Sequence, residues 1–415
     1  MGLTNSWQAV SKRWGHAFHA MCSDMAMFPP RLPHYFIQKF TRPGDVVLDP
    51  FCGRGTTALQ ACVTGRVGIG VDCNPLAYVL TRAKIDPPRP EVVESRLRAL
   101  ENDMFYGDAE GVPEPIEMLV HRTTLKQLVY LKGMLDLDDP CDAFIAATIL
   151  GLMPGAGSRD PTRSNPLAIS IPNTFRLSPS RIRPYIDERR LKKIPVNVFT
   201  ALRKKFKRLF VHELPVARGS AFCEPIENLT QIPNVHVRDR QVQLIVTSPP
   251  PPKVVKHGLH NGIRLWFLDV DPTGLDKAPS IDRRLDDYLV FIRRALARMY
   301  TTLRPGGVCC LVVGDVFERS RRGRVPLADE IRQMLQATRS RFRLCDIVKD
   351  RLPDRSTVSK IGREKIGRAT RVDRILVLYR DFIEEVSDEV DWSPPKKRKT
   401  RRARARAAAR SSAMA

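Results

Sequence analysis

The chain has 415 residues, of which 43% are hydrophobic, and it carries a formal net charge of +24. This hydrophobic share is enough for a sizeable core, and no apolar run approaches the roughly 20 residues that a membrane-spanning helix needs. So large a positive charge predicts a polyanionic partner, most commonly nucleic acid. Nine of these charges lie after Pro395, which leaves +15 on the rest of the chain. We therefore expect a basic face on the folded body in addition to a basic tail.

The nine cysteines include no C-x-x-C pair, so we expect neither a zinc ribbon nor a redox motif, and no metal site. Their odd number is typical of reduced thiols in a cytosolic or nuclear compartment.

The first predicted unit is a strand at residues 46–49, a glycine-rich loop, a helix at 56–62 and a second strand at 67–72. Both strands are apolar and end on a carboxylate, Asp49 and Asp72. A strand, a helix and a strand in this spacing form a βαβ unit, which predicts a parallel sheet.

Residues from about 86 to 215 are rich in helix formers, and we expect a helical insertion beside the sheet. Strands are predicted again at 242–246, 308–313 and 375–379, with helices at 284–303 and 327–337. The pattern predicts one α/β domain over residues 1–390. Residues 391–415 are expected to be a disordered basic tail that contacts nucleic acid.

The glycine-rich loop lies within residues 49–57. A tight glycine turn at the end of a strand lets the backbone approach a ligand closely. The carboxylate of Asp49 suits an ammonium group, and the following helix N-terminus suits a carboxylate. The methionine moiety of S-adenosylmethionine has both groups. The spacing of the glycines fits neither the dinucleotide-binding nor the triphosphate-binding loop.

The segment Asp-Pro-Phe-Cys-Gly-Arg-Gly-Thr-Thr at residues 49–57 resembles motif I of the DNA amino-methyltransferases. Phe-Pro-Pro-Arg-Leu at 28–32 resembles their motif X, and Thr-Ser-Pro-Pro at 247–250 resembles their motif IV, the catalytic loop. These motifs follow the order X–I–IV. Further similar segments lie at 70–75, 170–175, 303–307, 312–315 and 374–378, so that the resemblance covers roughly residues 16–380.

The resemblance implies a Rossmann-like fold that binds S-adenosylmethionine. Asp72 matches the acid that binds the ribose hydroxyls in the family. Ser220 lies where many relatives have the aspartate of Gly-Asp-Ala, which meets the adenine. The cofactor-binding residues expected from the resemblance are Phe28, Asp49, Phe51, Gly53, Gly55, Thr56, Asp72 and Ser220.

The motif IV chemistry also follows from the residues. An exocyclic amine is a poor nucleophile because its lone pair is delocalised into the ring. Two acceptors aimed at its hydrogens, the Ser248 hydroxyl and the Pro249 carbonyl, favour the pyramidal form. Prolines, including Pro250, hold the loop so that both acceptors point the same way. The target base must leave the duplex to reach them.

The residue after Ser-Pro-Pro is normally aromatic in the family and stacks on the flipped base, but here it is Pro251. Stacking on an aromatic is worth about 1–3 kcal/mol per base. The aromatic residues of segment 265–267 are an alternative source of stacking.

Four interpretations therefore stay open. Ser-Pro-Pro favours methylation of cytosine N4, and adenine N6 is the nearest alternative. A DNA-binding protein that has lost turnover is the non-enzyme alternative, which Pro251 favours. An RNA guanine-N2 methyltransferase shares a similar motif I but usually has a different loop and an added RNA-binding domain.

The partners expected are double-stranded DNA and, as a second candidate, a cognate restriction endonuclease, with no membrane association. Target recognition is expected at residues 150–215 or 252–282. We expect a cytoplasmic, nucleoid-associated protein if the source is bacterial. The run Lys-Lys-Arg-Lys at 396–399 would predict nuclear import if the source is eukaryotic.

Overall fold

A computed structural model describes residues 3–11, 14–22, 28–104, 109–153, 167–171, 175, 177–232, 242–252, 258, 261–276, 284–318, 323–351, 372–383, 386–387 and 389–398. The expected segment at 170–175 lies partly outside these residues, and the tail beyond residue 398 lies wholly outside them.

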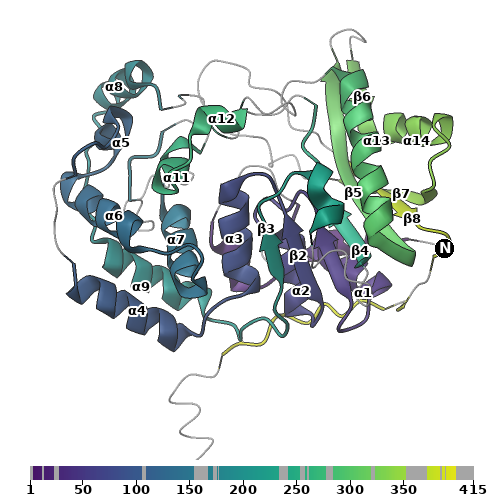
Figure 1. The fold of residues 1–415 in the computed structure, drawn as a ribbon, viewed down its shortest axis with the longest axis horizontal. Helices are drawn as coiled ribbons and strands as arrows, with labels where there is room; N and C mark the ends of the chain where they lie inside the picture. The colour runs from purple at the N-terminus through teal and green to yellow at the C-terminus, as the bar shows by residue number, and fades with distance from the viewer. Residues whose placement is uncertain are drawn as a thin grey trace, which may run out of the picture.

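A single sheet forms the centre of the molecule, with the strand order β3-β2-β1-β4-β5-β8-β7, and β6 pairs with β5 at one end (Figure 1). The strands are β1 (Val46–Asp49), β2 (Val67–Val71), β3 (Ser220–Phe222), β4 (Val242–Thr247), β5 (Leu303–Glu318), β6 (Gly323–Pro326), β7 (Arg343–Arg351) and β8 (Val372–Tyr379).

Strands β3, β2, β1, β4 and β5 run parallel to one another, whereas β8 runs antiparallel between β5 and β7. The strand order reverses between β1 and β4, which makes that place the topological switch point. Open sheets of this kind bind ligands outside the carboxyl ends of the strands at such a point. The expected Rossmann-like α/β fold, with a mostly parallel sheet, is confirmed.

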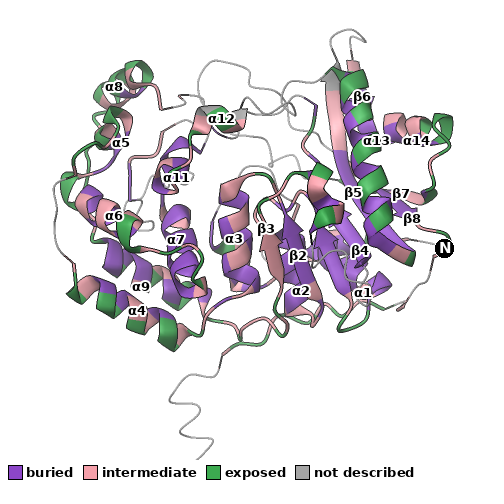
Figure 2. Cartoon of the chain, viewed as in Figure 1, coloured by how far each residue is buried: buried purple, intermediate pink, exposed green. Residues whose placement is uncertain are grey.

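Helices cover both faces of the sheet. Each face of the sheet has its own hydrophobic core, and successive side chains of β1 point into different cores. Val47 packs in the core on the α1 face, and Leu48 packs in the core on the face covered by α13 and α14. This alternation is the period of two that a strand imposes. The helices flanking the sheet are α1 (Arg31–Phe40), α2 (Thr56–Val63), α3 (Pro75–Ile85), α13 (Leu285–Thr302) and α14 (Leu327–Ala337). Figure 2 shows the strands of the sheet mostly buried and the outer faces of α13 and α14 exposed.

A helical region adjoins the sheet through α3 and has its own hydrophobic core around α7. Its helices are α4 (Pro90–Asn102), α5 (Glu114–Leu119), α6 (Arg122–Met134), α7 (Pro140–Leu152), α8 (Pro179–Glu188) and α9 (Val198–Leu209). They lie within the insertion expected at 86–215. Two short helices follow the expected catalytic loop in the chain, α11 (Gly262–Phe267) and α12 (Pro272–Asp276), and they lie above α7 in Figure 1, on the side of this region nearer the sheet.

Short 3-10 helices complete the described elements, at η1 (Ser6–Ala9), η2 (Ala17–Ala20) and η4 (Ile226–Gln231). None of the helices in the described part of the chain is both long and apolar enough to cross a membrane.

Residues 391–398, which the sequence predicts to begin a disordered tail, have a defined position in the structure. Together with residues 389 and 390 they form a segment that we call the C-terminal strap (residues 389–398). The strap lies along the lower edge of the sheet in Figure 1. The indole of Trp392 packs against Trp14 and His34, with ring centroids 5.6 Å and 5.1 Å away. The His34 Nε2 donates to the carbonyl of Asp391 at 2.7 Å.

The far end of the strap reaches the helical region. The backbone N–H of Arg398 donates to the carbonyl of Val211 at 3.0 Å, and Lys396 accepts from the N–H of Glu213 at 2.9 Å. The strap therefore joins the α1 side of the sheet to the segment after α9. The Arg398 guanidinium also pairs with the carboxylate of Glu91 on α4. The polar composition of the strap gives no sign of this role, because many of its contacts are made by backbone groups and one tryptophan.

Candidate active site

The carboxyl ends of three neighbouring strands bring the expected site residues together. Asp49 ends β1, Asp72 follows β2, and the catalytic loop follows β4 at Thr247. Because β1 lies between β2 and β4, Asp49 occupies the centre of this edge.

The loop after β1 depends on two glycines with left-handed backbone. Gly53 has a φ of 50° and Gly55 a φ of 69°, a region that other residues rarely adopt. A Cβ on Gly55 would lie 2.6 Å from the Thr81 hydroxyl oxygen of α3, whereas a Cβ on Gly53 would meet nothing within 4 Å. Gly55 is thus required for packing beneath the loop, and Gly53 leaves open space above it.

Asp49 is buried and hydrogen-bonded only to neutral donors among the described residues. The Thr247 hydroxyl donates to Asp49 Oδ1 at 2.6 Å, and the amide of Phe51 donates to the same oxygen at 3.2 Å. Burial raises the pKa of the Asp49 carboxyl to about 7, while these donors and the Thr57 hydroxyl oppose the rise. A cationic ligand group would favour the ionised form, and an amino-acid ammonium fits this site.

Asp72 holds the loop from the second strand. Its two carboxylate oxygens accept from the backbone N–H groups of Gly53 at 2.9 Å and Asn74 at 3.0 Å. The Asp72 side chain is half-buried. Its carboxylate therefore remains partly accessible to a ligand while it holds the loop. This position suits a group that binds ribose hydroxyls.

Three other expected cofactor-binding residues lie in different environments. Phe51 is half-buried, and its ring lies 5.9 Å from that of Phe291 on α13. Thr56 is buried at the start of α2. Phe28 is half-buried and packs against the core on the α1 side of the sheet.

Ser220, which the resemblance places near the adenine, begins β3 and pairs with Ile69, so its backbone lies below the carboxyl edge of the sheet. At that edge, the carbonyl of Phe222 accepts from the N–H of Asp72 at 3.2 Å. Phe222 and the exposed Cys223 therefore lie closer than Ser220 to the acid of the second strand.

The residues of the expected catalytic loop, which follows β4, alternate in exposure. Ser248 and Pro251 are exposed, Pro249 and Pro252 are buried, and Pro250 is half-buried. The strand end is fixed from two sides, because Thr247 donates to Asp49 and the Thr57 hydroxyl donates to the carbonyl of Val246 at 2.9 Å. The aromatic candidate Trp266 lies on α11, half-buried against the core of the helical region.

Two α3 residues that the sequence did not single out support the glycine loop. The Lys84 ammonium is buried and donates to the carbonyl of Arg54 at 2.6 Å. Thr81 donates to the carbonyl of Gly53 at 3.4 Å and lies 3.3 Å from the Cys52 sulfur. Their spacing of three on α3 places both on one face, which is the only signal the sequence offers for them.

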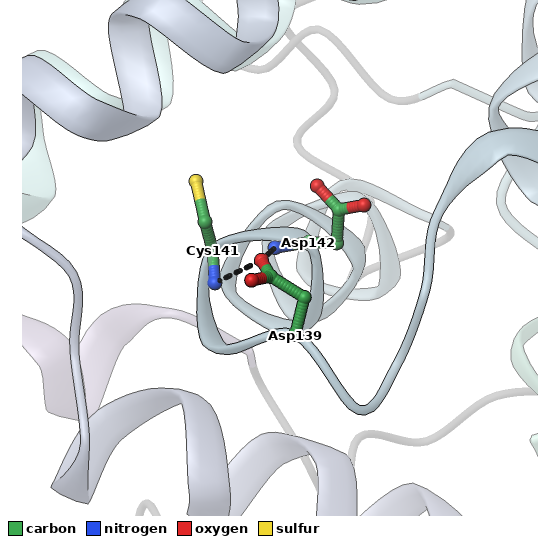
Figure 3. Close-up of side chains that lie close together, drawn as sticks. All are labelled: Asp139, Cys141 and Asp142. Carbon is green, nitrogen blue, oxygen red and sulfur yellow. Dashed lines mark hydrogen bonds between the residues drawn. The ribbon is translucent and has the colours of Figure 1, made fainter.

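A cluster of Asp139, Cys141 and Asp142 lies at the start of α7 (Figure 3). The Asp139 carboxylate caps the helix by accepting from the N–H groups of Cys141 and Asp142, at 2.8 Å and 2.9 Å. Both oxygens of Asp142 accept from the Arg96 guanidinium at 2.8 Å. Burial also raises the pKa of the Cys141 thiol to about 11. Capping and an ion pair account for this cluster.

Comparison with known proteins identifies the N-terminal part of the chain most clearly. The sequence profile of a DNA methylase family that includes N6 and N4 enzymes matches residues 3–81. The type II methyltransferase M.MjaII of Methanocaldococcus jannaschii is 36% identical over 58 residues, which are 14% of this chain and 11% of that protein. M.BglI of Bacillus subtilis is 30% identical over 95 residues, which are 23% of this chain and 27% of that protein.

Among solved structures, the rRNA methyltransferase aviRa from Streptomyces viridochromogenes matches 89% of this chain and 97% of its own. The identity is 10% and the TM-score is 0.34. An rRNA methylase from Streptococcus thermophilus matches 86% of this chain and 99% of its own, with 9% identity and a TM-score of 0.30. At these scores the likeness carries no argument. The fold rests on the strand order. The similarity to DNA methylases lies in residues 3–81, which contain the β1 loop and Asp72, and the chain spans only a small part of the length of the relatives that it matches.

Proposed function

We propose that this protein transfers a methyl group from S-adenosylmethionine to the exocyclic N4 of cytosine in double-stranded DNA. The observation that carries the proposal is the hydrogen bond between Thr247 and Asp49. It connects the acid expected to bind the methyl donor directly to the loop expected to bind the target amine. Binding of donor and acceptor at adjacent strand ends is what a transfer between them requires.

The donor site fits the methionine end of the cofactor. Asp49 would bind the ammonium group, and the amide groups of the β1 loop and the N-terminus of α2 would receive the carboxylate. Asp72 would bind the ribose hydroxyls, and Phe51 would contact the adenosine. When bound, the cofactor supplies an electrophilic methyl group.

The loop after β4 would prepare the acceptor. Ser248 is exposed and accepts one hydrogen of the target amine, and the Pro249 carbonyl accepts the other. Both contacts strengthen as the nitrogen becomes pyramidal, so they favour the transition state over the ground state. Pro250 and Pro252 restrict the backbone on the far side of the two acceptors.

Serine at the first position of the loop favours cytosine N4, since the adenine-specific members usually have Asn or Asp there. Adenine N6 is the alternative within the same chemistry. The exposed ring of Pro251 supports a second candidate function, a DNA-binding protein with weak or no turnover. Loss of aromatic stacking worth about 1–3 kcal/mol per base lowers the rate by roughly five- to 150-fold.

The identity of the methylated nucleoside separates these functions. Unmethylated duplex DNA is incubated with the protein and isotopically labelled cofactor, digested to nucleosides and analysed by mass spectrometry. Labelled N4-methylcytosine supports the proposal, and labelled N6-methyladenine replaces it with the alternative. Label that appears only in Pro251→Tyr supports a protein whose natural loop has lost turnover.

The family likeness supports three further parts of the proposal. The basic residues after Pro395 would contact DNA, a cognate restriction endonuclease would recognise the same site, and the protein would act in the cytoplasm on the nucleoid. The similar proteins M.MjaII and M.BglI are type II methyltransferases, and this similarity motivates the proposed endonuclease.

A further inference from the structure

A cluster of positive charge lies directly after α8. We call it the basic turn and define it as Arg189, Arg190, Lys192 and Lys193, all of which are exposed. Two acids precede it on α8, Asp187 and Glu188, which are also exposed. The positive charges therefore outnumber the negative ones two to one over these seven residues.

The backbone fixes the shape of this turn. Arg190 has a left-handed φ of 50°, its N–H donates to the carbonyl of Asp187 at 3.1 Å, and the N–H of Leu191 donates to that of Ile186 at 3.0 Å. These bonds end the helix, and its C-terminal carbonyls favour nearby cations.

A contact with an aromatic ring holds the Arg189 side chain in place. Its guanidinium lies 4.6 Å from the centre of the Tyr185 ring, and that ring packs edge-on against Phe175 at 5.1 Å. The basic turn is thus a partly ordered surface, which loses less side-chain entropy on binding than free lysines would.

The start of α8 is fixed next to the segment that follows the catalytic loop. Leu177 lies so close to Gly262, the first residue of α11, that a Cβ there would be 2.6 Å from the leucine side chain. In Figure 1, α8 lies at the upper left and the β5–β6 pair at the upper right, so both lie on the upper side of the molecule. A duplex presenting a base to the β4 loop would approach from that side.

We propose that the basic turn binds the phosphate backbone of the DNA duplex whose base enters the catalytic loop. This inference rests on the proposed function and adds the surface that holds the substrate. Four cations on a turn fit a polyanion with closely spaced charges, because each neutralised phosphate releases a condensed counterion. The contact is independent of base sequence, so it positions the duplex without selecting the site.

Salt dependence of binding tests the proposal without knowledge of the recognised sequence. The triple variant Arg190→Gln, Lys192→Gln and Lys193→Gln removes three charges and leaves Arg189 on its tyrosine. The matched control is Lys204→Gln, Lys207→Gln and Arg208→Gln, which removes the same residue types from exposed positions on α9. Figure 1 shows α9 low in the helical region, away from α8.

Affinity for a fluorescent duplex of about 30 base pairs is measured by anisotropy from 50 to 200 mM salt. The slope of log affinity against log salt falls by about 2.7 in the α8 variant, since each phosphate contact contributes about 0.9. The ratio of the wild-type affinity to the affinity of this variant therefore falls by about 40-fold between 50 and 200 mM salt. The α9 variant keeps the wild-type slope.

An unchanged slope in the α8 variant, or equal losses in both variants, overturns the inference. Calorimetric binding of S-adenosylmethionine and methyl transfer by the wild type are measured on the same preparations. If the wild type binds DNA and methylates it while the α8 variant keeps its slope, only this inference fails. If the wild type neither binds the duplex nor transfers a methyl group, the proposed function fails with it.

Discussion

Replacing Thr247 with valine isolates the contact that joins the two halves of the site. Valine has the same shape and a strong preference for strands, so β4 should form normally. The change removes the hydroxyl that donates to Asp49 Oδ1 at 2.6 Å. A hydrogen bond to a charged group contributes about 1.5–3 kcal/mol, which corresponds to roughly a 13- to 160-fold loss of affinity for S-adenosylmethionine.

The pH dependence adds a second signature. The Thr247 hydroxyl lowers the pKa of the Asp49 carboxyl, which burial raises to about 7. Without that donor the pKa of Asp49 rises further, so the carboxyl is protonated at neutral pH and cannot pair with an ammonium group. The affinity lost in Thr247→Val should therefore be largest near pH 7 and smaller near pH 8.5.

Calorimetric titration with the cofactor at both pH values measures these effects. Thr247→Ser keeps the hydroxyl and serves as the matched control, and near-ultraviolet circular dichroism checks that both variants fold. Equal affinity of the valine variant and the wild type at both pH values would refute the role assigned to this bond. The same conclusion would follow if serine lost as much affinity as valine.

Four further results are expected. Wild-type cofactor affinity rises about tenfold per pH unit below pH 7 and levels off above it, as Asp49 ionises, and Asp49→Asn binds weakly with no such rise in a calorimetric titration. Gly55→Ala combines a φ of 69° with a Cβ 2.6 Å from Thr81, so urea unfolding should show a loss of about 1–3 kcal/mol. Burial lowers the pKa of His16 to about 4. The unfolded chain therefore takes up a proton first below pH 6.5, and wild-type stability relative to His16→Asn should fall by about 3 kcal/mol between pH 6.5 and 4. Trp392→Ala removes two ring contacts of the strap and should cost about 2 kcal/mol in the same unfolding assay. An unchanged midpoint would show that the strap is not part of the fold.

The sequence predicts the centre of this fold well because local signals agree there. The strands at β1 and β2 are apolar runs that end on carboxylates, and the glycines between them permit a tight turn with positive φ. The helix expected at 327–337 has the observed bounds of α14. The pattern of apolar residues in a buried strand or an amphipathic helix indicates both the type of element and the face that is buried.

The elements that the sequence does not predict lack such a signal. β3 has three half-buried residues, and β7 lies at the end of the sheet with charged residues on its exposed positions. The bond between Thr247 and Asp49 depends on the register of β1 against β4, which no local pattern specifies. Ser220 resembles a position of the family, but this resemblance does not specify the residue at which β3 begins.

Methyl transfer by the wild type and Ser248→Ala tests the central claim most directly, with cofactor binding measured in parallel. We predict label on the N4 of cytosine with the wild type. We predict a loss of at least about 100-fold in the alanine variant, as for removal of one preorganised hydrogen-bonding group from an active site, with the affinity for the cofactor unchanged. Undiminished transfer by Ser248→Ala, or no transfer by a wild type that binds the cofactor, would contradict the account.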